Sequence, residues 1–501
     1  MKKYRGLTAF LLALTLCASL AGCGSTESAT SNTSNTEVTN EAMTESVADK
    51  GEKDDARPGD PPDGGMPDGE RPDAPPDGMG GGGNPPGGGF GGGHSSADID
   101  YKGSTEITSA DSQSGQTYSS DTADESALLI STSDAVTIYN PTVNKTGDSN
   151  GGDSCNFYGL NAAVLVKDGS NTTITGGTIT SDADGANGVF CYCGNCGQNG
   201  ASGDGTTLTI RDTVIKTTGD GSGGIMTTGG GITYAYDLDV ETSGRSSAPI
   251  RTDRGGGTVY VDGGTYTSNG LGSPAIYSTA EIHVENAELT SNLSEGVCIE
   301  GKNSIELTNC DMTANNTQCN SNATFNDTIM IYQSMSGDAV SGTSSFTMNG
   351  GTLTSKNGHV FHVTNTNAII NLNGVKIVNN DSDNILLSLC ADGWSGAGNI
   401  ATLNADGQEL SGIIKVGDDS ELTLNLTNGS AFTGSIDGAI INAKGTTIST
   451  EVGTVNVTLD STSTWTLTAD TNITSFDGDA SNIISNGYTL YVNGTALTGT
   501  K

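Results

Sequence analysis

Apolar residues recur along the chain at a short, fixed spacing. Eight times an aliphatic or aromatic residue, or once an alanine, stands five positions before a second apolar residue. In seven of these pairs an aliphatic residue follows ten positions after the second member. The pairs are Ile174/Ile179, Ile210/Ile215, Ala235/Val240, Val261/Tyr266, Val284/Leu289, Leu307/Met312, Met348/Leu353 and Leu372/Ile377, and the third members are Val189, Ile225, Ile250, Ile276, Ile299, Val363 and Leu387.

The second members of these pairs recur at steps of 36, 25, 26, 23, 23, 41 and 24 residues. A repeated coil of three strands, with occasional loop insertions, explains this spacing better than a series of independent domains. Only Leu307/Met312 lacks a third member, and a long insertion follows it. The pattern therefore predicts one all-β solenoid in which Ile250, Ile276 and Ile299 are stacked inside.

Small polar residues follow the second strand of each predicted coil. Side chains alternate along a strand, so the residue two positions after the second member should also point inward. These residues are Ser181, Thr217, Thr242, Ser268, Ser291, Ala314, Ser355 and Asn379, and the next position holds Asn269, Asn292, Asn315 and Asn380. Asparagine tolerates the left-handed backbone of a sharp turn, so the asparagine row predicts a corner with stacked side chains.

These ladders resemble those inside right-handed parallel β-helix proteins such as pectate lyases and bacterial adhesins. The resemblance covers about residues 130–400. It implies an all-β, single-stranded right-handed parallel β-helix (solenoid) and says little about chemistry, because one fold hosts many functions. After Asn399 the strands alternate apolar and polar residues without the three-strand count, and look similar to the C-terminal coils of autotransporter passengers.

The composition and the N-terminal sequence add two further segments. Only 33% of residues are hydrophobic and 73 are glycine, which suits thin coils better than a globule. Residues 23–98 are rich in Ser, Thr, Pro, Gly and Asp, which predicts a disordered tether. The predicted organisation is a signal peptide at 1–22, this tether, a β-helix at 99–399, and at 400–501 a continuing solenoid with a C-terminal cap. The apolar stretch at 127–130 is predicted to cap the other end.

The first residues carry the pattern of a secretion signal. Lys2, Lys3 and Arg5 precede an apolar run from 7 to 20, and Leu-Ala-Gly-Cys23 ends it. This looks like a bacterial lipoprotein signal. The resemblance implies cleavage before Cys23, lipidation of its thiol, and a membrane-anchored location in the bacterial cell envelope, outside the cytoplasm. An ordinary secretory signal, or a membrane helix too short to span, is the alternative.

The chain is strongly acidic. Its 21 Lys and Arg face 58 Asp and Glu, for a formal charge of −37, so a polyanionic nucleic acid would be repelled. No cofactor is expected, because no phosphate-binding loop, nucleophile elbow or zinc-protease helix occurs. Calcium remains possible at loop carboxylates, although acidic residues in loops often only form solvated turns. The carboxylate pairs are Asp182/Asp184, Asp381/Asp383 and Asp477/Asp479.

Charged and aromatic residues follow the inward aliphatics of the third strand. If coils stack about 4.8 Å apart, Arg251, Tyr277 and Glu300 form one outer row, with Asp253 and Lys302 beside it and Arg254 at the turn. An aromatic ring can stack on a sugar while Arg and carboxylates bind its hydroxyls, so these six residues are candidate glycan-binding residues. The alternative is that opposite charges on adjacent strands stabilise the sheet.

Catalytic precedents on this architecture fit only in part. A pectate-lyase-like site would need clustered Asp with an Arg or Lys base, and the characteristic Asp-His pair of that family is absent. Inverting hydrolysis needs two carboxyl groups about 6.5–9.5 Å apart, and Asp253 and Glu300, two coils apart, are the candidate pair for that separation. The catalytic residues are therefore unknown. His359 and His362, three residues apart on a strand, are predicted to project to opposite sides, without a third metal ligand.

Cysteines cluster in one long loop. Cys191, Cys193 and Cys196 lie between a third strand and the next first strand, and Cys155 lies in an earlier insertion. Outside the cytoplasm disulfides are the default, so these four cysteines are a candidate disulfide or metal loop, and spacing alone leaves free thiols open as well. Cys298 and Cys319 are a second candidate pair.

Three functions remain open on this sequence. An anchored adhesin or polysaccharide-binding protein is favoured by the anchor, the tether and the long repetitive flank, since many weak contacts would add through avidity. Its partners would be the membrane and a host or cell-wall glycan. The first alternative is a polysaccharide lyase or glycoside hydrolase acting on uronate-containing glycans. The second is a passive envelope spacer, and the oligomeric state stays open.

Overall fold

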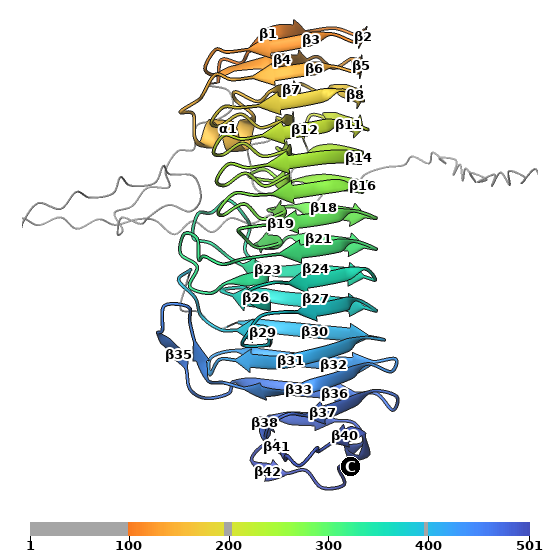
Figure 1. Cartoon of the computed structure of the whole chain (residues 1–501), viewed down its shortest axis with the longest axis vertical. Helices are drawn as coiled ribbons and strands as arrows, with labels where there is room; N and C mark the ends of the chain where they lie inside the picture. The colour runs from red at the N-terminus through yellow and green to blue at the C-terminus, as the bar shows by residue number, and fades with distance from the viewer. Residues whose placement is uncertain (1–98, 195–202, 395–398) are drawn as a thin grey trace, which may run out of the picture. The chain divides into compact units, whose positions relative to one another are not determined.

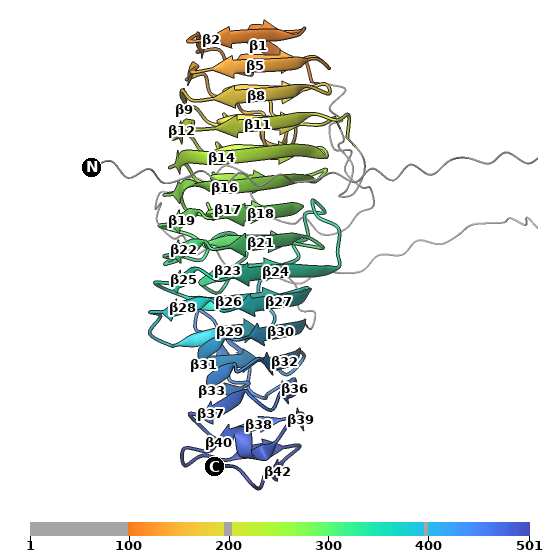
Figure 2. The ribbon, with the colours of Figure 1, turned by 90° about the vertical axis from the view of Figure 1, so that its right-hand side faces the viewer.

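The structure, a computed structural model, describes residues 99–194, 203–394 and 399–501. Successive strands pair in parallel with strands one coil earlier and one coil later, which confirms the expected parallel β-helix. Figures 1 and 2 show the coils piled along the long axis. The predicted signal peptide, tether and lipidation at Cys23 lie outside the described residues.

Three stacks of strands form the walls of the solenoid. The first stack contains β2 (Asp111–Ser114), β5 (Ala135–Tyr139), β8 (Asn171–Thr175), β11 (Thr207–Arg211), β14 (Gly231–Thr242), β16 (Gly257–Ser268), β18 (Glu281–Glu285), β21 (Ser304–Thr308), β24 (Thr343–Asn349), β27 (Asn367–Asn373), β30 (Ile400–Asp406), β32 (Glu421–Thr427), β36 (Thr454–Leu459) and β39 (Ser475–Asp477). Its outer face is turned to the viewer in Figure 2.

The second stack follows the first around one corner. It contains β3 (Thr117–Ser120), β6 (Thr142–Lys145), β9 (Thr178–Ser181), β12 (Val214–Thr217), the second halves of β14 and β16, β19 (Glu288–Ser291), β22 (Asp311–Ala314), β25 (Thr352–Ser355) and β28 (Lys376–Asn379). Because β14 and β16 run through the corner unbroken, the first two stacks join into one sheet of 22 strands.

The third stack is a separate sheet of 15 strands. It contains β1 (Lys102–Ile107), β4 (Glu125–Ser131), β7 (Val164–Lys167), β10 (Val189–Tyr192), β13 (Ile225–Thr228), β15 (Ile250–Thr252), β17 (Ile276–Ser278), β20 (Val297–Glu300), β23 (Asp327–Tyr332), β26 (His359–Thr364), β29 (Ile385–Leu389), β31 (Glu409–Val416), β33 (Ala431–Asp437), β37 (Thr464–Leu467) and β40 (Ile483–Ile484). The helix α1 (Asp153–Tyr158) lies in the loop before β7.

The apolar spacing in the sequence sets the register of the core. All eight predicted pairs stack in the predicted order, from Ile174 against Ile210 to Met348 against Leu372 in the first stack. In the third stack Ile250 faces Ile276, but Ile276 faces Val297 and not Ile299. The turn before β20 is two residues shorter than the turn before β17, and both Val297 and Ile299 are apolar and buried, so spacing alone could not separate them.

The asparagine row is a ladder, but it is not the left-handed corner. Asn292 donates to the Asn269 side chain at 2.8 Å, and Asn315 donates to the Asn292 carbonyl at 3.2 Å. Asn357, and not Asn380, continues the row with a hydrogen bond to Asn315. A row of left-handed residues lies instead at the corner between the first and second strands and includes Asn140, Asp212, Asp237, Gly263, Asn286, Asn309 and Gly350. Short polar side chains or glycine carry the positive φ there.

The two ends of the solenoid differ from the middle. Residues 127–130 belong to β4 and pair on both sides, so they form an ordinary rung and the coil of β1, β2 and β3 lies outside them. From residue 400 onward each coil has two strands, because the second stack ends at β28. The small sheet of β38 (Thr471–Ile473), β41 (Leu490–Val492) and β42 (Thr495–Ala496) closes the C-terminal end. A short hairpin, β34 (Ile440–Ile441) and β35 (Thr447–Ser449), follows β33, and its Ile440 packs with Phe325 and Cys390 of earlier coils.

Candidate functional site

The predicted glycan-binding row lies under loops and not on an open wall. Arg251 is 4% exposed, Tyr277 7% and Glu300 2%. Arg251 and Tyr277 face each other on neighbouring coils, as predicted, but the next position of that row is Cys298. Glu300 is two residues further along β20 and faces Tyr332. We call this outer side of the third stack, with the loops over it, the covered face.

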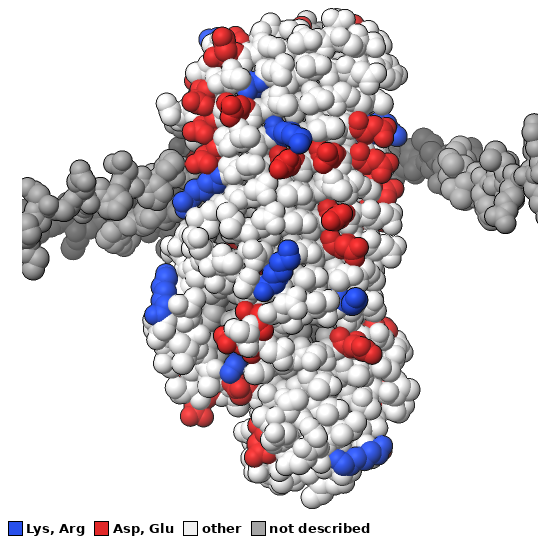
Figure 3. All heavy atoms as spheres, viewed as in Figure 1, with Lys and Arg blue, Asp and Glu red and all other residues white. Residues whose placement is uncertain are grey.

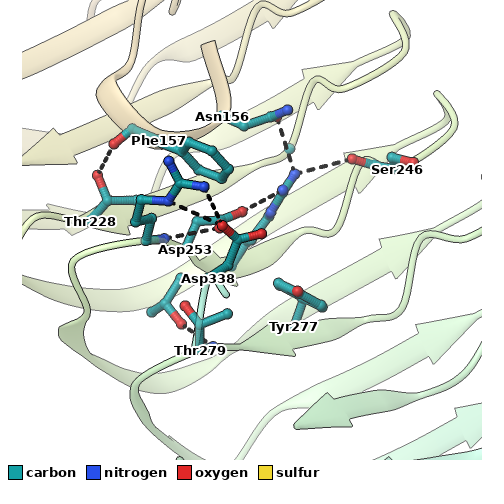
Figure 4. A network of polar contacts seen from close by, with 12 residues as sticks. Asn156, Phe157, Thr228, Ser246, Asp253, Tyr277, Thr279 and Asp338 are labelled. Atoms are coloured by element: carbon teal, nitrogen blue, oxygen red, sulfur yellow. Dashed lines mark hydrogen bonds and ion pairs between the residues drawn. The ribbon is translucent and has the colours of Figure 1, made fainter. Parts of the chain in front are cut away.

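An internal ion pair occupies the centre of the covered face. Arg251 Nη2 lies 2.5 Å from Asp253 Oδ2, and both side chains are buried. Arg251 also donates to Asn156 Oδ1 of α1 at 3.4 Å and to the Ser246 carbonyl at 3.3 Å (Figure 4). Burial raises the pKa of Asp253 to about 6, against the opposing attraction of Arg251. The pair therefore holds α1 against the coils.

A second arginine ties a distant loop to the same face. Arg254 donates from Nε to Asp338 Oδ1 at 3.1 Å and lies over the Phe157 ring, 4.1 Å from its centroid (Figure 4). The loop that contains Asp338 follows β23 and is thus fixed to α1 through one guanidinium. Lys302, which was expected beside Asp253, is exposed and outside this network.

The buried Glu300 carboxylate accepts hydrogen bonds from four hydroxyl groups. Its Oε2 accepts hydrogen bonds from Tyr277 at 2.6 Å and from Tyr332 at 3.1 Å. Its Oε1 accepts from Ser336 at 3.2 Å and from Ser334. Burial raises the pKa of both tyrosines well above its usual value, so the phenols stay protonated and act as donors. Protein groups therefore use the acceptors that a sugar would need.

A buried serine, histidine and aspartate meet on the same face, which spacing did not predict. His362 Nδ1 and His359 Nδ1 each lie 2.7 Å from Ser388 Oγ, and His362 Nε2 lies 3.4 Å from Asp392 Oδ2. The two histidines thus reach one atom, although opposite directions were predicted; His359 is the first residue of β26, where strand alternation constrains it least. Ser388, His362 and the Asp392 side chain are fully buried, so no substrate reaches the hydroxyl in this arrangement.

The described thiols of the predicted cysteine loop are free. Cys155, Cys191 and Cys193 form no disulfide with one another, and Cys196 lies outside the described residues. Burial raises the pKa of Cys155 to about 11 and that of Cys191 to about 12, which disfavours the thiolate that a metal needs. Cys298 and Cys319 are also free thiols. No group of three or more His, Cys, Asp or Glu within the described ranges is placed to hold a metal ion.

Two of the loop carboxylates named as calcium candidates accept hydrogen bonds from the protein backbone. Asp184 Oδ1 accepts from the Asp220 N–H of the next coil at 2.8 Å, and Asp381 accepts from the Gly358 N–H at 2.9 Å. These contacts satisfy backbone donors at the corners of the coils.

The first stack carries an open hollow that the sequence reading missed. A pocket of about 230 Å³ is lined by Tyr234, Tyr236, Tyr260, Val261, Asp262, His283 and Glu285, from β14, β16 and β18. We call it the tyrosine groove. Tyr234, Tyr260 and His283 stand in register on three successive coils and are stacked at 5.2 and 5.1 Å between centroids. Tyr260 is 40% exposed.

The second row of the groove is acidic. Tyr236, Asp262 and Glu285 face one another on the same three coils. Asp262 accepts one hydrogen bond from Asn286 at 2.8 Å. Acidic side chains also gather along the right-hand edge in the upper half of Figure 3. One feature of the sequence could have indicated this groove: Tyr234 and Tyr260 occupy the same first-strand position in two adjacent coils. The predicted site was instead placed on the third strand.

Comparison with protein-family models, curated proteins and solved structures found no match. The described part of the chain contains no helix that is long and apolar enough to cross a membrane. The fold and the geometry of its two outer faces are therefore the basis for assigning a function.

Proposed function

We propose that this chain is a polysaccharide-binding protein of the bacterial envelope that holds glycan in the tyrosine groove. The observation that carries the proposal is the groove itself: solvent-open, lined by aromatic rings, and bordered by carboxylates that can accept sugar hydroxyls. The groove follows the long axis of the solenoid because each of its rows has one residue per coil. An elongated ligand fits such a shape.

The covered face supports this choice by contrast. Arg251, Tyr277 and Glu300 already bind protein groups, so a glycan there would have to displace α1 and the loop after β23. In the tyrosine groove, Glu285 has no hydrogen-bond or ion-pair partner among the described residues, and Asp262 has one donor. Free acceptors on a rigid sheet are what sugar hydroxyls require.

The lipid anchor at Cys23 is the second part of the proposal. The charged start, the apolar run and Leu-Ala-Gly-Cys support it. Anchored copies would bind a polymeric glycan through many weak sites at once. Metabolic labelling with an alkyne fatty acid should mark the wild-type chain and not a Cys23→Ser variant. Equal labelling of both would contradict the anchor and leave the groove untouched.

Binding at the groove can be measured directly. The full chain carrying Cys23→Ser, which prevents acylation, is titrated calorimetrically with wall and host oligosaccharides. Tyr260→Ala should weaken binding at least about tenfold, in the range of lost aromatic contacts. The matched control is Tyr139→Ala, another exposed tyrosine of the first stack, three coils from Tyr236 in the same row. Absence of binding to any glycan, or equal loss in both variants, would remove the proposal.

Hydrolysis at the same groove is the second candidate. Asp262 and Glu285 face each other on adjacent coils, where backbones lie about 4.8 Å apart. Retaining glycosidases use two carboxyl groups about 5–5.5 Å apart. Chromatography of incubated oligosaccharides separates the two functions: shortened products that vanish in Asp262→Asn indicate hydrolysis, and intact ligand indicates binding alone.

A further inference from the structure

The tyrosine groove has a one-sided charge. Two carboxylates, Asp262 and Glu285, belong to its lining, and neither lysine nor arginine does. Glu281 and Glu306 lie beside it and hold His283, whose Nε2 is 2.9 Å from Glu281 and whose Nδ1 is 3.3 Å from Glu306. A uronate would meet repulsion here, whereas a cation would be attracted.

One aromatic ring of the groove, Tyr236, already contacts a cation on its face away from the hollow. The Arg211 guanidinium lies over the Tyr236 ring, 4.6 Å from its centroid. Arg211 faces Tyr236 from the preceding coil, and the following coil places Asp262 opposite Tyr236. Because Asp262 is short and lines the groove while Arg211 does not, the hollow lies on the side of Tyr236 away from Arg211. That side offers a ring next to a carboxylate, which is a favourable setting for an ammonium group.

We propose that the tyrosine groove selects glycans that carry free amino groups, namely de-N-acetylated hexosamine polymers. The ammonium group is placed between Asp262, Glu285 and the Tyr236 ring, and the neighbouring hydroxyls lie along Tyr260. Acetylation removes the charge and adds bulk, so it removes both the ion pair and the cation–ring attraction. This inference rests on the proposed function and narrows its ligand class.

The repeat explains why an amino-sugar polymer is favoured over a single amine. Asp262 and Glu285 face each other on successive coils, so two negative charges lie one coil apart along the axis of the groove. A polymer with regularly spaced ammonium groups can use more than one of them. A lysine-rich protein carries similar charge without the hydroxyls, and it is the competing occupant in the test.

The experiment uses the full chain with Cys23→Ser and four probes: glucosamine hexamer, N-acetylglucosamine hexamer, galacturonic acid hexamer and poly-lysine. We expect the free-amine hexamer to bind at least about tenfold more tightly than the acetylated one at low salt, and this advantage to shrink as salt rises. Asp262→Asn and Glu285→Gln should each reduce the advantage several-fold. Glu288→Gln, an exposed glutamate on β19 outside the groove, is the matched control and should leave it unchanged.

Every other result of this experiment would overturn a specific part of the proposal. Equal binding of both hexosamine hexamers, still lost in Tyr260→Ala, overturns the amino-sugar inference and keeps glycan binding. Preference for galacturonic acid overturns the charge argument. Poly-lysine binding that depends on Asp262 without hexosamine binding indicates a basic protein partner and overturns both glycan proposals.

Discussion

The covered face and the tyrosine groove are built from similar residues on one scaffold, yet they differ in what they offer a ligand. Both contain tyrosines and carboxylates in register on adjacent coils. On the covered face, α1 supplies a partner for Arg251 and the loop after β23 supplies partners for Glu300, while Asp253 pairs with Arg251 itself. Among the described residues, the lining of the tyrosine groove comes from strands β14, β16 and β18 and not from an inserted loop, so the carboxylates stay open. Inserted loops, and not residue types, decide which outer wall can bind.

The largest effect should come from Arg251→Ala. It leaves Asp253 buried without its cation, and breaking a buried pair in this way costs about 3–5 kcal/mol in the free energy of unfolding. Chemical denaturation at neutral pH measures the loss. Lys302→Ala, an exposed charge at the edge of the same face, is the control and should change stability by less than about 0.5 kcal/mol. Similar values for both would mean that the covered face is not held by this pair.

The Arg251→Ala loss should also depend on pH. Asp253 has a folded pKa of about 6, above its ordinary value near 3.8, so the folded state binds more protons between pH 4 and 6. Stability linked to this carboxyl is therefore greatest at the acidic end and falls as the pH rises through 6. We expect Arg251→Ala to cost less at pH 5 than at pH 8. An Asp253→Asn variant lacks the titrating carboxyl and should lose this pH dependence.

Glu300→Ala should have the next largest effect. It removes the acceptor of Tyr277 and Tyr332, two buried phenols, and leaving such donors unsatisfied costs about 1–3 kcal/mol each. Thermal unfolding gives the stability change. Limited proteolysis should also show earlier cleavage in the loop after β23, because Ser334 and Ser336 lose the same carboxylate. Unchanged proteolysis would show that other contacts hold this loop.

The asparagine ladder should contribute less. Asn292→Ala removes the side-chain hydrogen bond to Asn269, at a partly exposed corner of the coil. We expect a loss of about 1 kcal/mol in denaturant unfolding, typical of a single neutral hydrogen bond. Asn380→Ala is the comparison, since Asn380 lies outside the ladder, and its effect should be smaller.

The smallest stability change is expected in the tyrosine groove. Tyr260→Ala should alter the free energy of unfolding by less than about 1 kcal/mol, because the residue is 40% exposed and loses only ring contacts on the outer wall. The same variant should lose glycan binding. A large loss of stability here would indicate that the stacked rings support the coil and would weaken their assignment to a ligand.

The core could be read from the sequence because its signal is local and repeated. Inward residues such as Ile174, Ile210 and Val261 follow one another at spacings that a coil of fixed length imposes. Where turn length changed, as before β20, two apolar candidates two residues apart gave the same pattern, and the register was misassigned by two. The left-handed corner was misplaced for a related reason, since Asn also forms ladders at ordinary backbone angles.

The candidate sites were harder to predict. The sequence correctly placed Arg251 and Tyr277 side by side. The burial of Arg251 and Glu300 depends on distant partners: Asn156 lies 95 residues before Arg251, and Ser334 lies 34 residues after Glu300. No periodic pattern encodes where an insertion folds back. The same holds for His362 on β26, which meets Ser388 and Asp392 of the following coil.

Amino-acid order alone determined the winding, the number of strands per coil and the inward-facing residues, because each of these follows from side chains repeating within some 25 positions. Tertiary structure alone decided which wall is closed and which is open. A loop has no sequence period, and its position depends on the hydrogen-bond partners that it finds in the folded chain. The burial of Arg251 and the exposure of Glu285 to solvent are therefore visible only in the folded structure.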